Sequence, residues 1–275
     1  MYTIQRTLKG LFLLLIAGSS IFLSNCKSKT KNNNITVTPV TVKDSIIENG
    51  ISAKLTATAE FPTTGNAILI NSLQEWMSET MGGSFFGQVN EGHSMLAFYT
   101  RKKMDSFKEF ELQDAEDTIT CEWTAHFKRL FENEQWITYG YDFYEYTGGA
   151  HGMSYDGGCS FRKTDGRRLD WGMFDQDKID VLRKMIKDSL QVNYFKFKSN
   201  NELDQELLSE DDRYTFPLPT TMPLFMKDGI KFTYQQYEIV PYSDGIPGCT
   251  ISYSQLDSLL SSTGKNLIHP QPTKK

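Results

Sequence analysis

The sequence predicts an α+β protein of two small domains, each an antiparallel sheet with packed helices. Stretches rich in Val, Ile, Thr and aromatic residues alternate with stretches whose apolar residues recur at helical spacing, without the regular strand–helix–strand rhythm of a parallel sheet. An apolar content of 39%, with 13% aromatic residues, suffices for a packed core. A turn signal, Thr-Asp-Gly at 164–166, divides the folded part. We therefore place an N-terminal domain at 45–165, a C-terminal domain at 166–262 and a tail at 263–275.

The first stretch of the chain has the pattern of an export signal. Two basic residues, Arg6 and Lys9, precede an apolar run at 11–23. This run is too short to span a bilayer, which takes about 20 residues. The residues just before Cys26 resemble the lipobox of bacterial lipoproteins, in which the signal is cut before a cysteine whose thiol is lipidated. We expect residues 1–25 to be the signal peptide and Cys26 to carry the lipid; an ordinary signal peptide with an incidental cysteine is the alternative.

The residues after the cysteine suggest where the protein resides. Positions 27–34 (KSKTKNNN) hold no apolar residue, and we assign 26–44 to the lipidated cysteine and a tether. The basic character of this segment suits an anionic membrane face, and it lacks the acidic run associated with surface export of some lipoproteins. We therefore expect a cell-envelope protein, anchored to the membrane through its N-terminal lipid and facing the periplasm.

The elements of the N-terminal domain follow from residue type and spacing. Runs rich in β-branched and aromatic residues between turn residues indicate strands, and apolar residues three or four positions apart indicate helices. The predicted strands lie within 35–61 (two strands about Asn49-Gly50), 119–130, 135–146 and 152–163, and the predicted helices at 69–80, ended by Gly82-Gly83, and at 96–110. The strands at 119–130 and 135–146 are separated by a short polar turn and form a hairpin.

The C-terminal domain shows the same mixture. Asp175 is placed to cap a helix whose apolar residues, from Ile179 to Leu190, fall on one stripe. The predicted elements after it are an irregular stretch with a short helix at 197–223, a hairpin of 224–226 with 230–237, a strand at 248–253 and a helix at 254–260. We expect Trp171, Phe232 and Tyr237 to be buried in the core.

The charge of the chain limits its partners. The formal net charge is −5, and removal of Arg6 and Lys9 with the signal brings it to about −7. Nucleic acid is therefore not an expected partner, because binding to its phosphates needs a basic surface.

Three cysteines follow Cys26, namely Cys121, Cys159 and Cys249. Their spacing contains no C-x-x-C unit, so neither a zinc knuckle nor a thioredoxin-like redox pair is supported. An exported compartment permits disulfides, so one structural disulfide and buried free thiols both remain open at this point.

Known catalytic and metal-binding patterns do not appear. The histidines, at positions 93, 126, 151 and 269, form no H-E-x-x-H pair, and G-x-S-x-G is absent. Asp142 and Glu145 fall on opposite faces of their strand by alternation, which weakens a paired-carboxylate scheme. Asp175, Asp177 and Asp180 do not satisfy a calcium loop and are better explained by the helix dipole. We therefore assign no catalytic residue, no metal site and no cofactor.

The segment from Tyr146 to Gly152 (Tyr-Thr-Gly-Gly-Ala-His-Gly) follows a long aromatic strand. Its glycines permit positive φ, so we expect a turn at 148–152 between two antiparallel strands. Tyr146, Gly148, Gly149 and His151 are the candidate binding residues, because a histidine in such a turn can face a partner. The alternative is that His151 bonds the carbonyl groups of its own turn.

The strand before this turn carries aromatic residues on both faces. Alternation places Trp136, Tyr144 and Tyr146 on one face and Tyr139, Tyr141 and Phe143 on the other. One set belongs to the core. The other is either an exposed platform for a sugar or a protein, or part of a strand that is buried on both sides.

Two stretches together resemble a known family. The Tyr-x-Gly-Gly-Ala-His motif at 146–151 and the stretches 232–245 (FTYQQYEIVPYSDG) and 251–256 (ISYSQL) are similar to the exported module shared by the lysozyme-sensing anti-sigma factor RsiV and the PdaC-type peptidoglycan deacetylase. The resemblance covers roughly 45–262 and implies two small α+β domains that meet near residue 165. It implies the module alone, without the deacetylase or the sigma-binding parts.

The resemblance implies recognition of lysozyme or of cell-wall material. We therefore expect a lipid-anchored binding module of the cell envelope that recognises lysozyme or peptidoglycan and performs no chemistry. The alternative is a hydrolase that modifies peptidoglycan or another glycan through carboxylates that the sequence alone does not pair.

Overall fold

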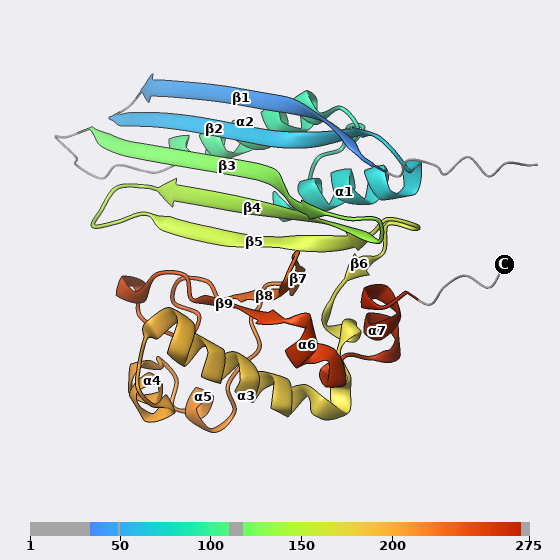
Figure 1. The fold of residues 1–275 in the computed structure, drawn as a ribbon. Helices are drawn as coiled ribbons and strands as arrows, with labels where there is room; N and C mark the ends of the chain where they lie inside the picture. Colours follow the sequence, from blue (N-terminus) through green and yellow to red (C-terminus); the bar gives the residue numbers. More distant parts are fainter. Residues whose placement is uncertain (1–33, 49, 110–117, 271–275) are drawn as a thin grey trace, which may run out of the picture. The chain divides into compact units, whose positions relative to one another are not determined.

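Two sheets organise the protein, as the computed structural model shows (Figure 1). The structure describes residues 34–48, 50–109 and 118–270. The first sheet has the order β1-β2-β3-β4-β5-β6, with β1 Thr36–Glu48, β2 Ile51–Thr64, β3 Ile119–Glu132, β4 Trp136–Tyr146, β5 Met153–Arg162 and β6 Arg168–Leu169. The second has the order β7-β8-β9, with β7 Leu224–Phe225, β8 Gly229–Thr233 and β9 Gly248–Ser252. The predicted α+β class is confirmed.

Seven α-helices accompany the sheets within the described residues. They are α1 Ala67–Thr80, α2 Gly92–Lys108, α3 Ile179–Leu190, α4 Asn200–Glu206, α5 Asp211–Tyr214, α6 Tyr253–Leu256 and α7 Ser262–Ile268. Helix α1 begins where the side chain of Asn66 accepts a hydrogen bond from the backbone of Ile68 at 3.0 Å. The side chain of Asp175 caps a short 3₁₀ turn, 176–178, that leads directly into α3. Both helix positions agree with the sequence prediction.

One pair of strands departs from the antiparallel sheet that we predicted. Strands β2 and β3 pair in parallel, with Ile51 opposite Ile119 and Ala59 opposite Phe127. The cause is the connection between them, because α1 and α2 carry the chain back to the end of the sheet where β2 began. A two-residue turn cannot make such a crossover. The two helices that the sequence predicts between these strands are long enough for it, but which strand the chain pairs with on its return is a tertiary choice.

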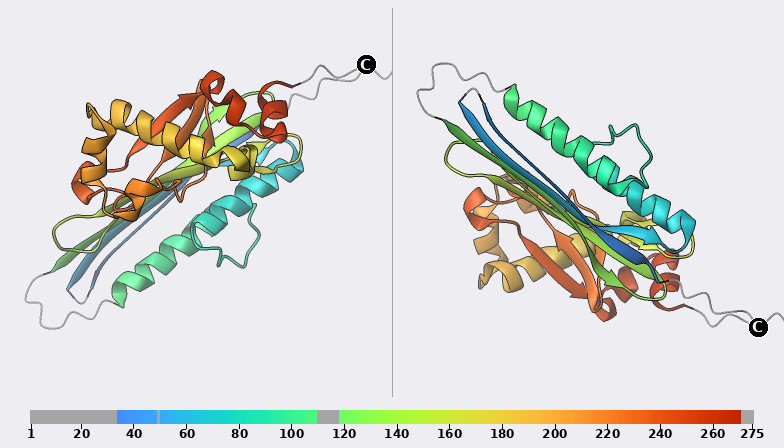
Figure 2. Two further views of the ribbon diagram at one scale, coloured as in Figure 1. Left: turned by 90° about the horizontal axis from the view of Figure 1, so that it is seen from below. Right: turned by 90° about the horizontal axis from the view of Figure 1, so that it is seen from above.

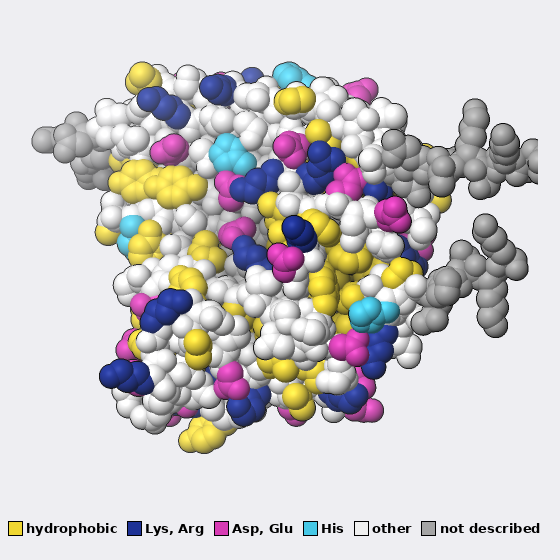
Figure 3. Space-filling view, in the orientation of Figure 1, with side chains coloured by type: hydrophobic (Ala, Val, Ile, Leu, Met, Phe, Trp, Pro, Cys, Tyr) yellow, Lys and Arg dark blue, Asp and Glu magenta, His cyan; other side chains and the backbone are white. Residues whose placement is uncertain are grey.

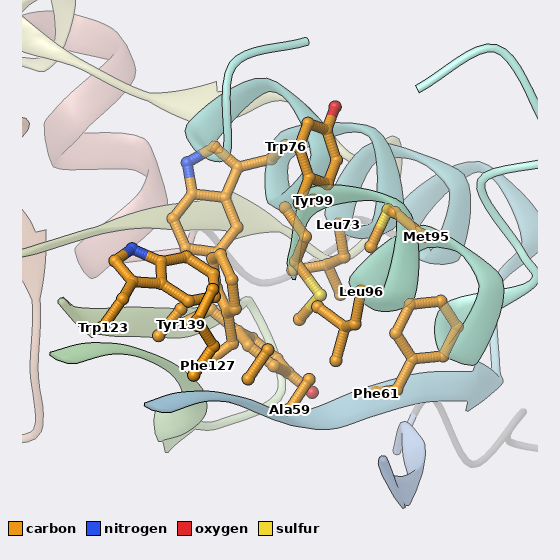
Figure 4. Close-up of a cluster of buried hydrophobic side chains, with 14 of the residues drawn as sticks. Ala59, Phe61, Leu73, Trp76, Met95, Leu96, Tyr99, Trp123, Phe127 and Tyr139 are labelled. Carbon is orange, nitrogen blue, oxygen red and sulfur yellow. The ribbon is translucent and has the colours of Figure 1, made fainter. Parts of the chain in front are cut away.

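The first core lies between the six-stranded sheet and the two N-terminal helices. Helices α1 and α2 cover one face of the sheet (Figure 2). Trp76 of α1 is at its centre and makes an edge-to-face contact with Phe127, with 5.7 Å between ring centroids (Figure 4). It makes a second such contact with Phe161 at 5.8 Å. Each fully buried aromatic side chain of this kind contributes about 1.5–3 kcal/mol through the area it removes from water.

The C-terminal sheet is fastened to the other face of the first sheet through Phe225 of β7. The backbone carbonyl of Phe225 accepts hydrogen bonds from Trp136 Nε1 at 2.9 Å and Thr138 Oγ1 at 2.6 Å. Its backbone N–H donates to Ser160 Oγ at 2.9 Å. Side chains of β4 and β5 therefore hold β7 in place. Strand β5 contributes to both domains, because Phe161 packs in the first core and Ser160 bonds β7.

The folded part extends beyond the domain limits that we assigned from the sequence. Strand β1 begins at Thr36, within the stretch 26–44 given to the tether, because alternating Val and Ile side chains pair it with β2. Helix α7 lies in the stretch given to the tail, where Ser261 caps the helix and Leu267 is buried in the second core. Strand β6 of the first sheet lies just past residue 165.

Of the three side chains predicted to be buried, Phe232 is fully buried, Trp171 is half-buried and Tyr237 is exposed. The prediction for Tyr237 was wrong because β8 ends at Thr233 and not at Tyr237. The backbone N–H of Tyr234 turns to the carbonyl of Pro247, and the chain beyond it leaves the sheet.

The three cysteines of the described residues are buried free thiols, so no disulfide joins Cys121, Cys159 and Cys249. They come from two sheets and lie in two different cores. No helix among residues 34–48, 50–109 and 118–270 is long and apolar enough to cross a membrane.

Candidate functional site

The β4–β5 connection is the glycine turn that the sequence predicts. Strands β4 and β5 pair antiparallel on either side of it. Gly148 and Gly149 have φ of +87° and +94°, a conformation that side chains with a Cβ rarely adopt. The hydroxyl of Tyr146 donates to the carbonyl of Gly149 at 3.0 Å and closes the turn. Within it, Ala150 and His151 are exposed.

The ring of His151 stacks on Tyr242, a residue of the C-terminal domain. The ring centroids are 3.8 Å apart and the planes differ by 18°. His151 Nδ1 lies 3.2 Å from the carbonyl oxygen of Gly152, and Tyr242 Oη donates to the same oxygen at 3.0 Å. The histidine therefore bonds its own turn and still presents its ring at the surface, so the two alternatives considered for it are not exclusive.

Tyr237 extends this stack, although its backbone has a conformation that is unfavourable for a tyrosine. Its φ is +63°, a left-handed value that is an outlier for a bulky residue, and its side chain is 48% exposed. Its ring centroid is 5.7 Å from that of Tyr242. We call His151, Tyr242 and Tyr237 the aromatic row. Sequence reasoning found only His151; the signal for the two tyrosines was their place in the stretch 232–245.

Two glutamines hold the segment beneath the aromatic row against the free edge of β5. Gln236 Oε1 accepts from the backbone N–H of Ser154 at 2.7 Å. Gln235 bonds both backbone groups of Asp156, accepting from its N–H at 3.1 Å and donating to its carbonyl at 2.6 Å. These bonds replace the neighbouring strand that β5 lacks at this point, and they fix the position of Tyr237 relative to the glycine turn.

Comparisons with known proteins agree with this two-part architecture. Residues 38–154 match the family described as deacetylase PdaC, and residues 173–254 match the family described as a protein of unknown function, DUF3298. The chain fits the two-domain PdaC/DUF3298 module. PdaC and DUF3298 domains indicate a cell-envelope-associated module.

Two solved structures resemble this chain over most of its length. A DUF3298 protein of Bacteroides fragilis is 19% identical, with a TM-score of 0.71 over 86% of this chain and 97% of that one. A DUF3298 protein of Pseudomonas aeruginosa is 16% identical, with a TM-score of 0.55 over 84% and 96% of the two chains. At these identities the likeness is one of fold. No curated protein matches the chain.

The carboxylates of the module's β4 are separated as the strand alternation predicts. Glu145 turns to the helices and pairs with Lys103 of α2 at 2.8 Å. Asp142 turns to the other face and pairs with Lys128 at 3.1 Å. In the part of the chain that the structure describes, no group of three or more His, Cys, Asp or Glu side chains could hold a metal ion.

Burial keeps the thiols of the module protonated. Loss of solvent raises the pKa of Cys159 to about 12 and that of Cys249 to about 11. A thiol with so high a pKa is a poor nucleophile at neutral pH, because the thiolate is the reactive form. These cysteines are therefore core residues. Cys26, the predicted lipidation site, lies outside the described residues.

Proposed function

We propose that this chain is a lipid-anchored, periplasm-facing recognition module of the cell envelope that binds a lysozyme through the aromatic row. The observation that carries the proposal is Tyr237, which is half-exposed on a left-handed backbone beside the His151–Tyr242 stack. Such a backbone costs about 1–3 kcal/mol, and an exposed ring returns little of that to folding. Strain of this kind is typical of positions where a side chain is presented to a partner.

The residues of the aromatic row are of the kind that bind a protein partner. Exposed tyrosines anchor protein interfaces, since they supply a large rigid contact area together with a hydroxyl group. The chain is acidic and lysozymes are strongly basic, so opposite potentials speed their encounter. Acidic and basic side chains are interspersed on the face drawn in Figure 3, so steering depends on the net charge more than on one patch. The family resemblance points to the same partner.

Binding of a lysozyme to the full chain in detergent tests the proposal. Tyr237→Gly and His151→Ala should each weaken binding by tenfold or more with nearly unchanged thermal midpoints, because neither ring is buried. Tyr214→Gly is the matched control, since Tyr214 is 89% exposed on α5 and does not belong to the aromatic row. Affinity should fall as ionic strength rises to about 0.15 M, where the Debye length is about 8 Å.

Three results would count against this proposal. Equal losses in Tyr237→Gly and Tyr214→Gly would exclude the row as the contact surface. A large drop in the thermal midpoint of His151→Ala would assign that residue to the stability of the turn. Release of acetate or reducing sugar from peptidoglycan by the wild-type chain, abolished by replacing a carboxylate, would instead support the hydrolase alternative.

The anchor is tested separately at Cys26. Cys26→Ser should abolish labelling with a radioactive fatty acid and release the protein from the membrane fraction, because the thiol is the acceptor of the lipid. Protease treatment of intact cells reports which side the module faces: protection is expected for a periplasm-facing protein. Labelling that persists in Cys26→Ser would overturn the lipoprotein assignment.

A further inference from the structure

A second candidate site lies on the helix-covered face of the first sheet. A cavity of about 320 Å³ opens between α2 and the ends of β3, β4 and β5 near the glycine turn. Ligand sites in proteins usually measure about 300–1,000 Å³, so this cavity has room for one small ring or a short segment. The proposed lysozyme surface does not include it.

Aromatic side chains from three neighbouring strands form the cavity floor. Trp123 of β3, Phe143 of β4 and Tyr155 of β5 all line it. Phe143 and Tyr155 are cross-strand partners, which places both rings on the same face of the sheet. Tyr155 is 42% exposed, an unusual degree for a ring that could have packed under α2. The floor therefore offers flat apolar surface to a ligand.

Trp123 also carries a donor without a partner. Its side chain is only 8% exposed, and its indole N–H makes no hydrogen bond within the described part of the chain. The nitrogen is not one of the buried polar atoms that lack a partner, so solvent reaches it, and its residue lines the cavity. The buried indole N–H of Trp136 donates to the carbonyl of Phe225, whereas that of Trp123 stays open to solvent and free to donate to a ligand. In Figure 4 the nitrogen of Trp123 lies on the side of the ring away from Leu96 and Phe61. An acceptor on a ligand would satisfy it.

The wall and rim of the cavity supply charges of both signs. Lys103 Nζ lies 2.8 Å from both carboxylate oxygens of Glu145, with the two side chains 26% and 32% exposed. Lys102 of the same helix lines the cavity and donates to Ser84 at 2.9 Å. A simple anion would be repelled by Glu145, and a simple cation would be repelled by the lysines. A purely apolar ligand would bury the ion pair without making new hydrogen bonds to it. The lining fits a neutral ligand with hydroxyl groups.

We propose that this cavity binds one sugar ring of a neutral glycan. A pyranose has an apolar C–H face that packs on Trp123 and Tyr155, and an edge of hydroxyl groups that act as both donors and acceptors. Those hydroxyls bond the Lys103–Glu145 pair and accept from the indole N–H of Trp123.

Titration of the full chain with oligosaccharides tests this assignment. The chain is held in a detergent without a sugar head group, such as lauryldimethylamine oxide, and titrated with chitotetraose, cellotetraose and maltotetraose by calorimetry and tryptophan fluorescence. At least one should bind with a Kd of 1 mM or tighter. Tyr155→Ala should weaken that binding tenfold or more, and Glu145→Gln should weaken it as well. Tyr214→Ala, a matched exposed tyrosine, should leave it unchanged.

The outcomes separate this site from the aromatic row. Tyr237→Gly should leave sugar binding intact, and Tyr155→Ala should leave lysozyme binding intact. Failure of all three oligosaccharides to bind would overturn the sugar site without affecting the lysozyme proposal. Binding that is unchanged by Tyr155→Ala and by Trp123→Phe would place the sugar elsewhere and overturn the site equally.

Discussion

The two ends of the β4–β5 hairpin use the same kinds of residue in opposite ways. At the Trp136 end, residues 136–140 are buried, whereas residues 141–146, towards the glycine turn, are only half-buried. Both halves are rich in aromatic side chains. At the Trp136 end, called the closed end here because packed layers cover both faces, these side chains join the two domains. At the turn end, called the open end because it lacks this double cover, they line the cavity that we propose for a sugar, and they flank the aromatic row.

The two ends differ in burial because different layers pack on them, and not because their residues differ in kind. The closed end has the α1–α2 layer on one face and β7 on the other, fastened at Phe225. The open end extends past β7, and the edge of β5 there is met by single side chains, those of Gln235, Gln236 and Lys231. Residues that lack a covering layer keep part of their surface for a partner.

Truncation of a side chain at the closed end should give the largest loss of stability. Trp136→Ala removes a side chain that is 5% exposed, contacts Phe225 and Tyr253 edge to face and donates to Phe225 O. We expect a loss of about 3–5 kcal/mol in the free energy of unfolding, measured by urea denaturation. Tyr146→Ala at the open end should cost less than about 1 kcal/mol. Equal costs would refute the distinction between the two ends.

A buried ion pair should give the next largest effect. Lys163, just after β5, is 1% exposed and lies 2.7 Å from Glu132 and 2.9 Å from the carbonyl of Asn133. Lys163→Ala leaves the Glu132 carboxylate with Arg129 as its remaining cation, and should cost about 3 kcal/mol. The exposed pair at Lys128 is the control, because Lys128→Ala should cost less than about 1 kcal/mol.

Alkaline pH should lower the stability of the whole fold by a smaller, gradual amount. Burial raises the pKa of Cys159 to about 12 and of Cys249 to about 11, and also raises the pKa of Tyr139. The folded state therefore holds protons that the unfolded state releases, so stability is full below about pH 9 and falls as pH rises towards 12. Denaturation midpoints across this range should show the decline, and Cys159→Ala with Cys249→Ala should make it smaller, leaving the part that Tyr139 contributes. A rise in stability over the same range would contradict the assigned burial.

The smallest effect is expected beside the open end. Tyr237→Gly removes a left-handed tyrosine, and the relief of strain is opposed by the greater flexibility of glycine in the unfolded chain, so the free energy of unfolding should change by less than about 1 kcal/mol. Thermal and urea denaturation measure it. A loss above 2 kcal/mol would mean that the ring stabilises the fold. Tyr237 would then belong to the core, and the contact surface would be limited to the rest of the aromatic row.

Local features of the chain could be predicted because short-range physics decides them. The glycines at 148 and 149 adopt positive φ wherever they are placed in a tight turn, and alternation put Asp142 and Glu145 on opposite faces. Helix α1 ends at Thr80, just before Gly82-Gly83, as its sequence indicates. In the candidate site, the sequence alone pointed to the turn and to His151.

Long-range contacts decided the rest. The parallel pairing of β2 with β3 depends on where α1 and α2 return the chain. The exposure of Tyr237 depends on a turn held by bonds to β5, about 80 residues earlier in the sequence. The sequence by itself determined the elements, the glycine turn and an acidic, aromatic-rich chain. Only the tertiary structure decided which aromatic side chains are covered, because that depends on which layers pack on each end of the hairpin, and no local pattern encodes it.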